Sequence, residues 1–140
     1  MYVDTMRYTG CFFDPKLLKK HLKNYDRYPL SRTITDPHVT FAYRPKKVPS
    51  ELFGQTVTVR AIGYGSDGEN EALLVEFENL PDPLQSYTEA IPVPHITLSI
   101  SESGKAVNSC MLKFKPITPF VLAGVFGGMD MAGTVHTADL

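Results

Sequence analysis

The chain has 140 residues, which suffice for one compact domain and are too few for two ordinary ones. Apolar residues make up 43% of the sequence and charged residues 21%, a balance typical of a soluble globular protein and unlike that of a disordered chain. With 14 basic and 15 acidic residues the formal net charge is -1, which excludes the overall positive field of a protein that coats long nucleic acid. We therefore expect one domain, residues 1–140, that meets any phosphate through local contacts.

The cysteines and the distribution of apolar residues indicate in which cellular compartment the protein resides. Cys11 and Cys110 stand far apart and form no C-x-x-C pair, so the sequence offers neither zinc-ligand spacing nor a disulfide framework. The amino terminus has no apolar signal-like core, and no apolar run approaches the roughly 18 residues of a membrane span. We expect a cytoplasmic protein with reduced thiols that does not enter a membrane.

The first third of the chain predicts a strand, a helix and a second strand. Residues 6–13 are rich in aromatic β-formers. Asp14 is placed as a helix N-cap and Pro15 as the first helical residue, and the apolar residues that follow recur on one face. After a stretch with several prolines, strand alternation from His38 onward puts Thr40 on the histidine's face and Tyr43 on the opposite face.

The rest of the chain predicts mostly strands. Residues 54–77 alternate into a glycine- and acid-rich turn and out again, which indicates a β-hairpin. The proline-rich segment 81–94 predicts a short helix or a loop, and the polar segment 101–110 predicts a turn that can open a short helix. Residues 114–126 predict a pair of strands that ends at the glycines 127–128.

The most specific feature is a phrase that occurs twice, PHVTF at 37–41 and PHITL at 94–98. In both copies a proline precedes the histidine and an aliphatic residue separates the histidine from a threonine. Alternation in the second copy places His95, Thr97 and Ser99 on one face. Composition alone explains a repeated His-x-Thr more readily than it explains both whole phrases. The alternative that both histidines are ordinary strand residues without a chemical role stays open.

The spacing within each phrase suits chemistry at phosphorus. A histidine and a threonine two positions apart on a strand lie about 6.5 to 7 Å apart along one face, so a phosphate can rest on the hydroxyl while the imidazole reaches a phosphate oxygen. Imidazole titrates near neutrality, so one ring can take a proton from water while another donates one to the leaving oxygen. The hydroxyls can donate to the non-bridging oxygens, a role that needs no metal ion.

The sequence gives little indication of a role for the other two histidines, and little indication of a metal site. His21 and His136 have no polar partner at strand spacing, and we interpret them as solvated surface residues. Two histidines on two strands could be metal ligands, but no third His or Cys, and no acidic residue, stands on the same strand faces. We expect no metal site and no other cofactor.

The two phrases resemble the signature of the two-histidine (2H) phosphoesterases, a pair of His-x-Thr/Ser motifs with hydrophobic neighbours. The surrounding order is also similar, with an aromatic strand and a helix first, a GYG-containing hairpin between the motifs, and SGKAVNS after the second. This order is most similar to that of the cyclic phosphodiesterase domain of fungal and plant tRNA ligases and of small stand-alone relatives in RNA repair or phage contexts.

The resemblance implies an α+β fold of two pseudo-symmetric lobes, each with an antiparallel sheet and flanking helices, around a central cleft. It implies a metal-independent hydrolase that opens 2′,3′-cyclic phosphates at RNA ends or cleaves small cyclic or 2′-5′-linked nucleotides. His38 and His95 carry over as the acid–base pair, in either assignment, and Thr40 and Thr97 as the phosphate-holding residues. The prolines of 81–94 disturb the place of an expected helix, which is a departure from the family pattern.

Four further residues are predicted to contact the substrate. Arg44 and Lys105 would supply positive charge, and Tyr8 or Phe12 would stack on a base. The alternative for each is an ordinary surface charge or a core aromatic residue. We expect a monomer whose partner is an RNA end or a small nucleotide.

Three rival functions stay open. A nucleotide-sensing module could keep the cleft without turnover, although the presence of both histidines and both threonines favours catalysis. A nucleic-acid chaperone or interaction domain, in which the phrase is only a β-repeat, would bind long RNA in a salt-dependent way and is disfavoured by the near-neutral charge. Within the enzyme class, the same residues could hydrolyse cyclic-oligonucleotide signals in a phage anti-defence setting.

Overall fold

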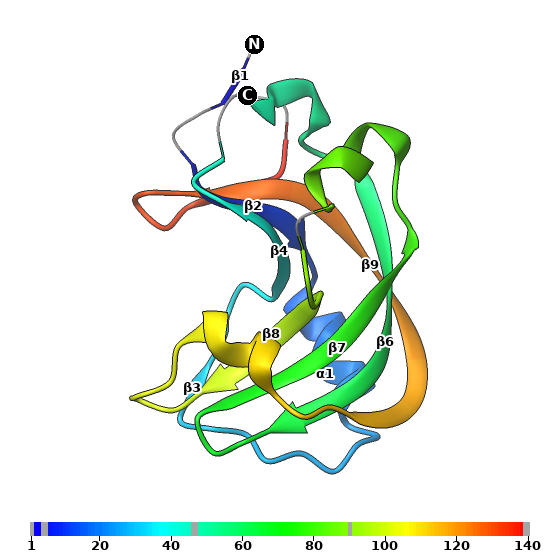
Figure 1. The fold of residues 1–140 in the computed structure, drawn as a ribbon, viewed down its shortest axis with the longest axis vertical. Coiled ribbons are helices and arrows are strands. Elements are labelled where there is room, and N and C mark those ends of the chain that lie inside the picture. Colours follow the sequence, from blue (N-terminus) through cyan, green and yellow to red (C-terminus); the bar gives the residue numbers. More distant parts are fainter. Residues whose placement is uncertain (1, 4–5, 46–47, 90, 139–140) are drawn as a thin grey trace.

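The structure is a computed structural model that describes residues 2–3, 6–45, 48–89 and 91–138. Within these ranges the fold is mainly antiparallel sheet, with one α-helix and three short 3₁₀ helices (Figure 1). The helices are α1 (Pro15–Leu22), η1 (Ser50–Leu52), η2 (Asp82–Tyr87) and η3 (Ala106–Met111). The α+β class is confirmed at this level. In the same ranges no helix has the length and apolarity that crossing a membrane requires.

Eight strands form one antiparallel sheet in the order β3-β8-β7-β6-β9-β2-β4, with β10 paired to β9. Its strands are β2 (Met6–Phe12), β3 (Arg32–Thr33), β4 (His38–Tyr43), β6 (Thr56–Ser66), β7 (Asn70–Asn79), β8 (His95–Ile100), β9 (Lys115–Asp130) and β10 (Val135–His136). A separate pair joins β1 (Tyr2–Val3) to β5 (Val48–Pro49). The sheet bends until β4, at one end, lies against β8, near the other (Figure 1).

The helix α1 forms where the sequence predicts it. Asp14 accepts a hydrogen bond of 2.9 Å from the backbone N–H of Lys16, and Pro15 takes the first helical position, where a missing N–H costs nothing. Leu18 and Leu22 are buried on the opposite side from the exposed lysines. The helix thereby adds an apolar stripe to the main core.

The core also explains how the two histidine strands are oriented. Val39 and Ile96 directly follow the histidines in sequence and are almost fully buried. Because successive side chains of a strand point to opposite faces, the histidines beside them are turned away from the core and remain partly exposed. The alternation that the sequence predicts for the start of both strands is confirmed.

The carboxy-terminal strand differs from the prediction. The β6–β7 hairpin forms as expected, but the predicted pair of strands at 114–126 is wrong, because β9 is one strand from Lys115 to Asp130. It pairs with β6 and then with β2, which joins the two ends of the sheet. A register shift at 117–119 lets the strand pass its two prolines without ending.

Candidate active site between two histidine strands

His38 and His95 are the first residues of two strands that lie against each other (Figure 1). Both rings are partly buried. The charge of His95 is close enough to contribute to lowering the pKa of His38. The fold therefore brings together two imidazoles that are far apart in the chain.

The two rings are held in the same way. Nδ1 of His38 lies 2.7 Å from the carbonyl oxygen of Asp36, and Nδ1 of His95 lies 2.8 Å from that of Val93. A carbonyl oxygen can only accept, so each Nδ1 carries a proton, and in the neutral ring Nε2 keeps its lone pair. Each ring therefore has one nitrogen that is free to accept a proton.

The proline before each histidine accounts for this shared tether. The carbonyl oxygens of Pro37 and Pro94 accept backbone hydrogen bonds, of 2.9 Å from Phe13 and of 3.1 Å from Val75. A residue that precedes proline is restricted to extended conformations, which fixes the direction of the carbonyl that holds the ring. The sequence phrase thus contains both the ring and the means of orienting it.

A register shift falls at the same place in each phrase. The β2 partners of β4 shift between Thr40 and Ala42, which leaves Phe41 as the extra residue. The β7 partners of β8 shift so that Leu98 is the extra residue. Phe41 and Leu98 both stand three positions after their histidine, and such bulges end the strict alternation of side chains.

These bulges correct two predictions about which side chains share a face. The Thr97 hydroxyl lies 2.9 Å from that of Ser109, whereas Ser99 donates to a carboxylate on β7, so the two hydroxyls have separate surroundings. Tyr43, predicted opposite to His38, lines one cavity with it.

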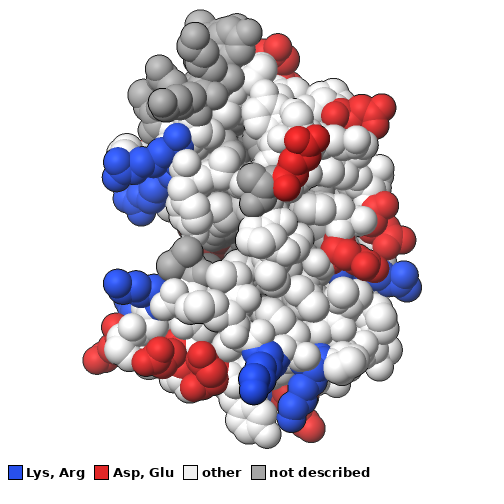
Figure 2. All heavy atoms as spheres, in the orientation of Figure 1, with Lys and Arg blue, Asp and Glu red and all other residues white. Residues whose placement is uncertain are grey.

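Two cavities open beside the histidines. We call the one of about 300 Å³ that His95 lines the His95 cavity, and the one of about 460 Å³ that His38 lines the His38 cavity. Tyr43, 58% exposed, lines both. The His95 cavity is otherwise mainly apolar, with Ile91, Pro92 and Val93 on its wall. On the left of Figure 2 the surface is hollowed, with Lys or Arg side chains above and below.

The two aromatic residues predicted to stack on a base both pack on a histidine, and Tyr8 also lines the His38 cavity. The Tyr8 ring stacks on that of His38 with centroids 4.6 Å apart, and the Phe12 ring lies tilted at 5.4 Å. Tyr8 and Phe12 are only 7% and 8% exposed. Burial raises the pKa of Tyr8 to about 12, so it remains a neutral phenol that covers the imidazole.

Burial lowers the pKa of both histidines below the ordinary value of 6.5. For His38 the charge of His95 lowers it further, while the hydrogen bond to the Asp36 carbonyl opposes the change. For His95 the bond to Val93 opposes it in the same way. Both rings are therefore neutral at pH 7 in the free protein.

The two threonines differ in what their hydroxyls contact. Thr40 is partly exposed and lines the His95 cavity. Thr97 is 7% exposed, and its hydroxyl contacts Ser109 and, at 3.4 Å, the carbonyl oxygen of Ala106. Ser109 in turn accepts a hydrogen bond of 3.0 Å from the Asn70 side chain. Thr40 therefore stands on a cavity wall, whereas the Thr97 hydroxyl belongs to a buried chain of hydrogen bonds.

The cationic residues that line the two cavities are not the two that the sequence suggests. Arg44 follows β4 with a positive φ of 46°, and Lys105 precedes η3; both are exposed, and neither is among the residues that line the two cavities. Arg7 and Arg32 line the His38 cavity instead. Sequence reasoning missed them because their placement depends on strand register, which no local pattern reveals.

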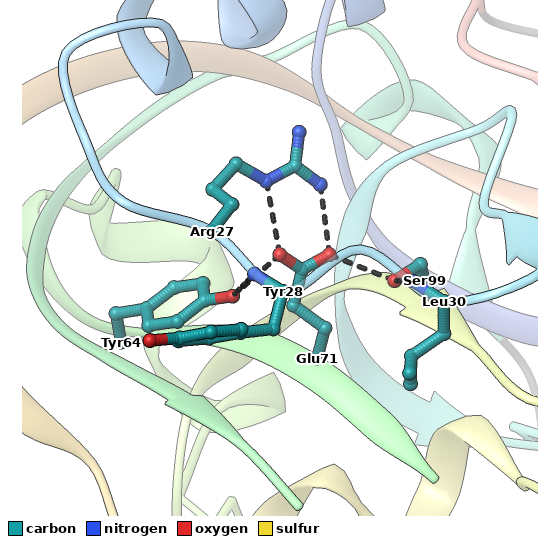
Figure 3. A network of polar contacts seen from close by, with 6 residues as sticks. All are labelled: Arg27, Tyr28, Leu30, Tyr64, Glu71 and Ser99. Atoms are coloured by element: carbon teal, nitrogen blue, oxygen red, sulfur yellow. Dashed lines mark hydrogen bonds and ion pairs between the residues drawn. The ribbon is translucent and has the colours of Figure 1, made fainter. Parts of the chain in front are cut away.

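A buried carboxylate anchors the segment that leads to the site (Figure 3). Glu71 is fully buried and accepts two hydrogen bonds from Arg27, of 2.9 and 2.7 Å. Tyr64 and Ser99 also donate to it, at 2.6 and 2.7 Å. Burial alone would raise the pKa of Glu71, but these donors outweigh it and the net pKa is lowered. Glu71 is therefore a paired carboxylate rather than a candidate acid.

The same network holds the backbone of the segment after α1. The backbone N–H of Tyr28 donates to the Tyr64 hydroxyl at 2.8 Å, and that of Leu30 donates to Ser99 at 2.9 Å (Figure 3). Residues 33–36, which follow this segment, form one wall of the His38 cavity. The network thus positions part of the site, and no local pattern in the sequence indicates it.

The other two histidines have specific partners, so the prediction that they are simply solvated is wrong. His21 stacks on Phe120 with ring centroids 4.5 Å apart. Nε2 of His136 lies 2.8 Å from a carboxylate oxygen of Asp130. Each therefore has a local structural role.

Across the described ranges, no three His, Cys, Asp or Glu side chains are grouped so that they could hold a metal ion. No family model, curated protein or solved structure matches the chain.

Proposed function

We propose that the protein is a metal-independent phosphodiesterase of the 2H type that hydrolyses 2′,3′-cyclic phosphates at RNA ends or small cyclic or 2′-5′-linked nucleotides. One observation carries the proposal. His38 and His95 come from two strands that lie against each other across the bent sheet, and each is held in the same tautomer by the carbonyl two residues before it. General acid–base catalysis at one phosphorus needs two such rings in one place.

The lowered pKa values suit this chemistry once substrate is present. Both rings are neutral in the free protein, and a bound phosphodiester anion favours the protonated form of one of them. That ring then donates its proton to the leaving oxygen. The other accepts a proton from water as the water oxygen forms the new bond to phosphorus, so one P–O bond forms as another breaks.

The threonine hydroxyls supply hydrogen bonds to the non-bridging oxygens. We assign this role first to Thr40, because it lines the His95 cavity. The Thr97 hydroxyl can donate to the phosphate only if it gives up its weak hydrogen bond of 3.4 Å to the Ala106 carbonyl oxygen. The two hydroxyls therefore contribute unequally.

The repeated local geometry also supports a two-lobed, pseudo-symmetric arrangement around the cleft. Both phrases share the proline, the Nδ1 tether and a bulge three positions after the histidine. Each phrase also lies beside an antiparallel partner, β2 or β7. This correspondence favours a 2H fold over two unrelated strand histidines.

Hydrolysis of 2′,3′-cyclic nucleotides in EDTA tests the proposal. We expect turnover by the wild type and a loss of about 10²-fold or more in His38→Ala and in His95→Ala. His21→Ala is the matched control and should keep the wild-type rate, since His21 lies on α1 and stacks on Phe120. Binding without turnover, across a panel of cyclic and linear nucleotides, would favour the sensing module instead.

A further inference from the structure

The two cavities differ in charge, and the difference bears on what the scissile phosphate is attached to. The His95 cavity is lined mainly by apolar side chains, including Ile91 and Val93. The His38 cavity is lined by two arginines, Arg7 and Arg32. A phosphate held between the histidines would therefore have an apolar space on one side and a cationic space on the other.

The two arginines are held in place by backbone carbonyls. Nη2 of Arg7 donates to the carbonyl oxygen of Met131 at 3.0 Å. Nη2 of Arg32 donates to that of Ser101 at 2.8 Å, and Nε donates to the same oxygen at 3.3 Å. Nη2 also lies 3.2 and 3.3 Å from the carbonyl oxygens of Glu102 and Gly104, so the N–H groups of Arg32 that remain for a ligand are those of Nη1. Nη1 of each arginine donates to no acceptor within the part of the chain that the structure describes. Both guanidinium groups are thus positioned and keep N–H groups for a ligand.

The charges around these arginines leave the wall positive. Asp36 is the carboxylate on the wall of the His38 cavity, so Arg7, Arg32 and Asp36 sum to one positive charge. A fixed guanidinium matches the geometry of a phosphate and binds it more strongly than a neutral donor does. The cavity therefore has the chemistry of a phosphate subsite beyond the scissile group.

We propose, on the basis of the function proposed above, that the substrate carries a second phosphate one nucleoside away from the scissile one, bound by Arg7 and Arg32. The His95 cavity takes a nucleobase of the other arm, and Tyr43 offers a ring between the two arms. A cyclic mononucleotide has one nucleoside and no second phosphate, so it fills one cavity only. The substrate class is thus an oligonucleotide, linear or cyclic.

Matched dinucleotides test this inference. ApA, pApA and ApAp, each with 2′-5′ and with 3′-5′ linkage, are compared with 2′,3′-cyclic AMP and a cyclic dinucleotide at low salt. We expect kcat/KM for at least one form with a second phosphate to exceed that for the matching ApA by about ten-fold. The ratio should fall toward one in Arg7→Gln and should persist in Arg60→Gln, an exposed arginine on β6. It should also fall with added salt.

Failure of this inference and failure of the proposed function are distinguishable. Turnover of 2′,3′-cyclic AMP without any preference for a second phosphate overturns the inference and leaves the function standing. Absence of turnover on every substrate overturns the function. In that case calorimetry with His38→Ala still decides the inference, because ApA and the phosphorylated forms must then differ about ten-fold in Kd. Equal Kd values, or a preference that survives Arg7→Gln, contradict it.

Discussion

The strand that begins at His38 and the strand that begins at His95 carry the same phrase, yet their surroundings differ. The rings share a tautomer and a tether, and both phrases contain a bulge. His38, however, lies under the Tyr8 ring beside a cationic cavity, while His95 lines an apolar one. The comparison teaches that a short phrase can set local geometry, whereas the strands and loops packed around it set the chemistry.

The largest difference we expect between the two sides is in the threonines. Thr40→Val should lower kcat/KM by about 10²-fold, because Thr40 lines the His95 cavity and its hydroxyl is the proposed donor to the phosphate. Thr97→Val should cost less activity but about 1 kcal/mol of stability, because Ser109 loses a buried partner. Steady-state kinetics and urea unfolding separate these effects, with Thr58→Val as the control. Equal losses of activity in the two variants would refute the asymmetry.

The hydrogen-bond network of Glu71 holds β8 and the segment after α1 together. Glu71→Gln should lower the free energy of unfolding by about 2 kcal/mol, because a buried ion pair with Arg27 loses its charge. Glu76→Gln, on the exposed face of the same strand, should stay within about 0.5 kcal/mol of the wild type. Urea denaturation at pH 7 measures both. A Glu71→Gln variant as stable as the wild type would mean that the network does not hold the segment in place.

The pH dependence of activity tests whether His38 and His95 act together as one acid and one base. Because both histidine pKa values lie below 6.5, and catalysis needs one ring protonated and one neutral, kcat/KM should peak below pH 6.5. It should fall as the pH rises through neutrality, since the general acid then loses its proton, and fall again at low pH, when both rings are protonated. A maximum well above neutral pH would contradict the lowered pKa values of the two histidines.

The smallest expected effect is a shift in the pKa of His38 when the Tyr8 ring that covers it is removed. Tyr8→Leu should admit water to the His38 ring and raise its pKa toward the ordinary value of 6.5, because burial is the main cause of the lowering. An NMR titration of the imidazole protons follows the change, with Tyr28→Leu as the control, because the Tyr28 side chain is 70% exposed and does not line the His38 cavity. If the pKa of His38 did not move, the Tyr8 ring would not be what keeps water from it.

The features of the site that depend on local sequence pattern could be predicted from the sequence. Asp14 and Pro15 mark the start of α1, and alternation places His38 and His95 away from the core. These features follow from neighbouring residues alone. The local signal is therefore strong enough to single out His38 and His95 as the candidate pair.

The parts that the sequence does not reveal depend on register. Gly10 shows why: a Cβ there would lie 2.2 Å from the carbonyl oxygen of Val39, so this glycine allows β2 to approach β4 at the bulge. Nothing near Gly10 in the sequence indicates that approach. The pairing of Glu71 with Arg27 and the placement of Arg7 in a cavity arise in the same way, from contacts between distant segments.

The measurement that tests the central claim most directly is a double-mutant cycle on kcat/KM with His38→Ala, His95→Ala and the double variant. Two groups that act in one transition state are strongly non-additive, so the double variant should be about as slow as the slower single variant, roughly 10² to 10³-fold below the wild type. Losses that multiply to about 10⁴-fold, or a single variant with wild-type activity, would contradict two imidazoles acting on one phosphorus.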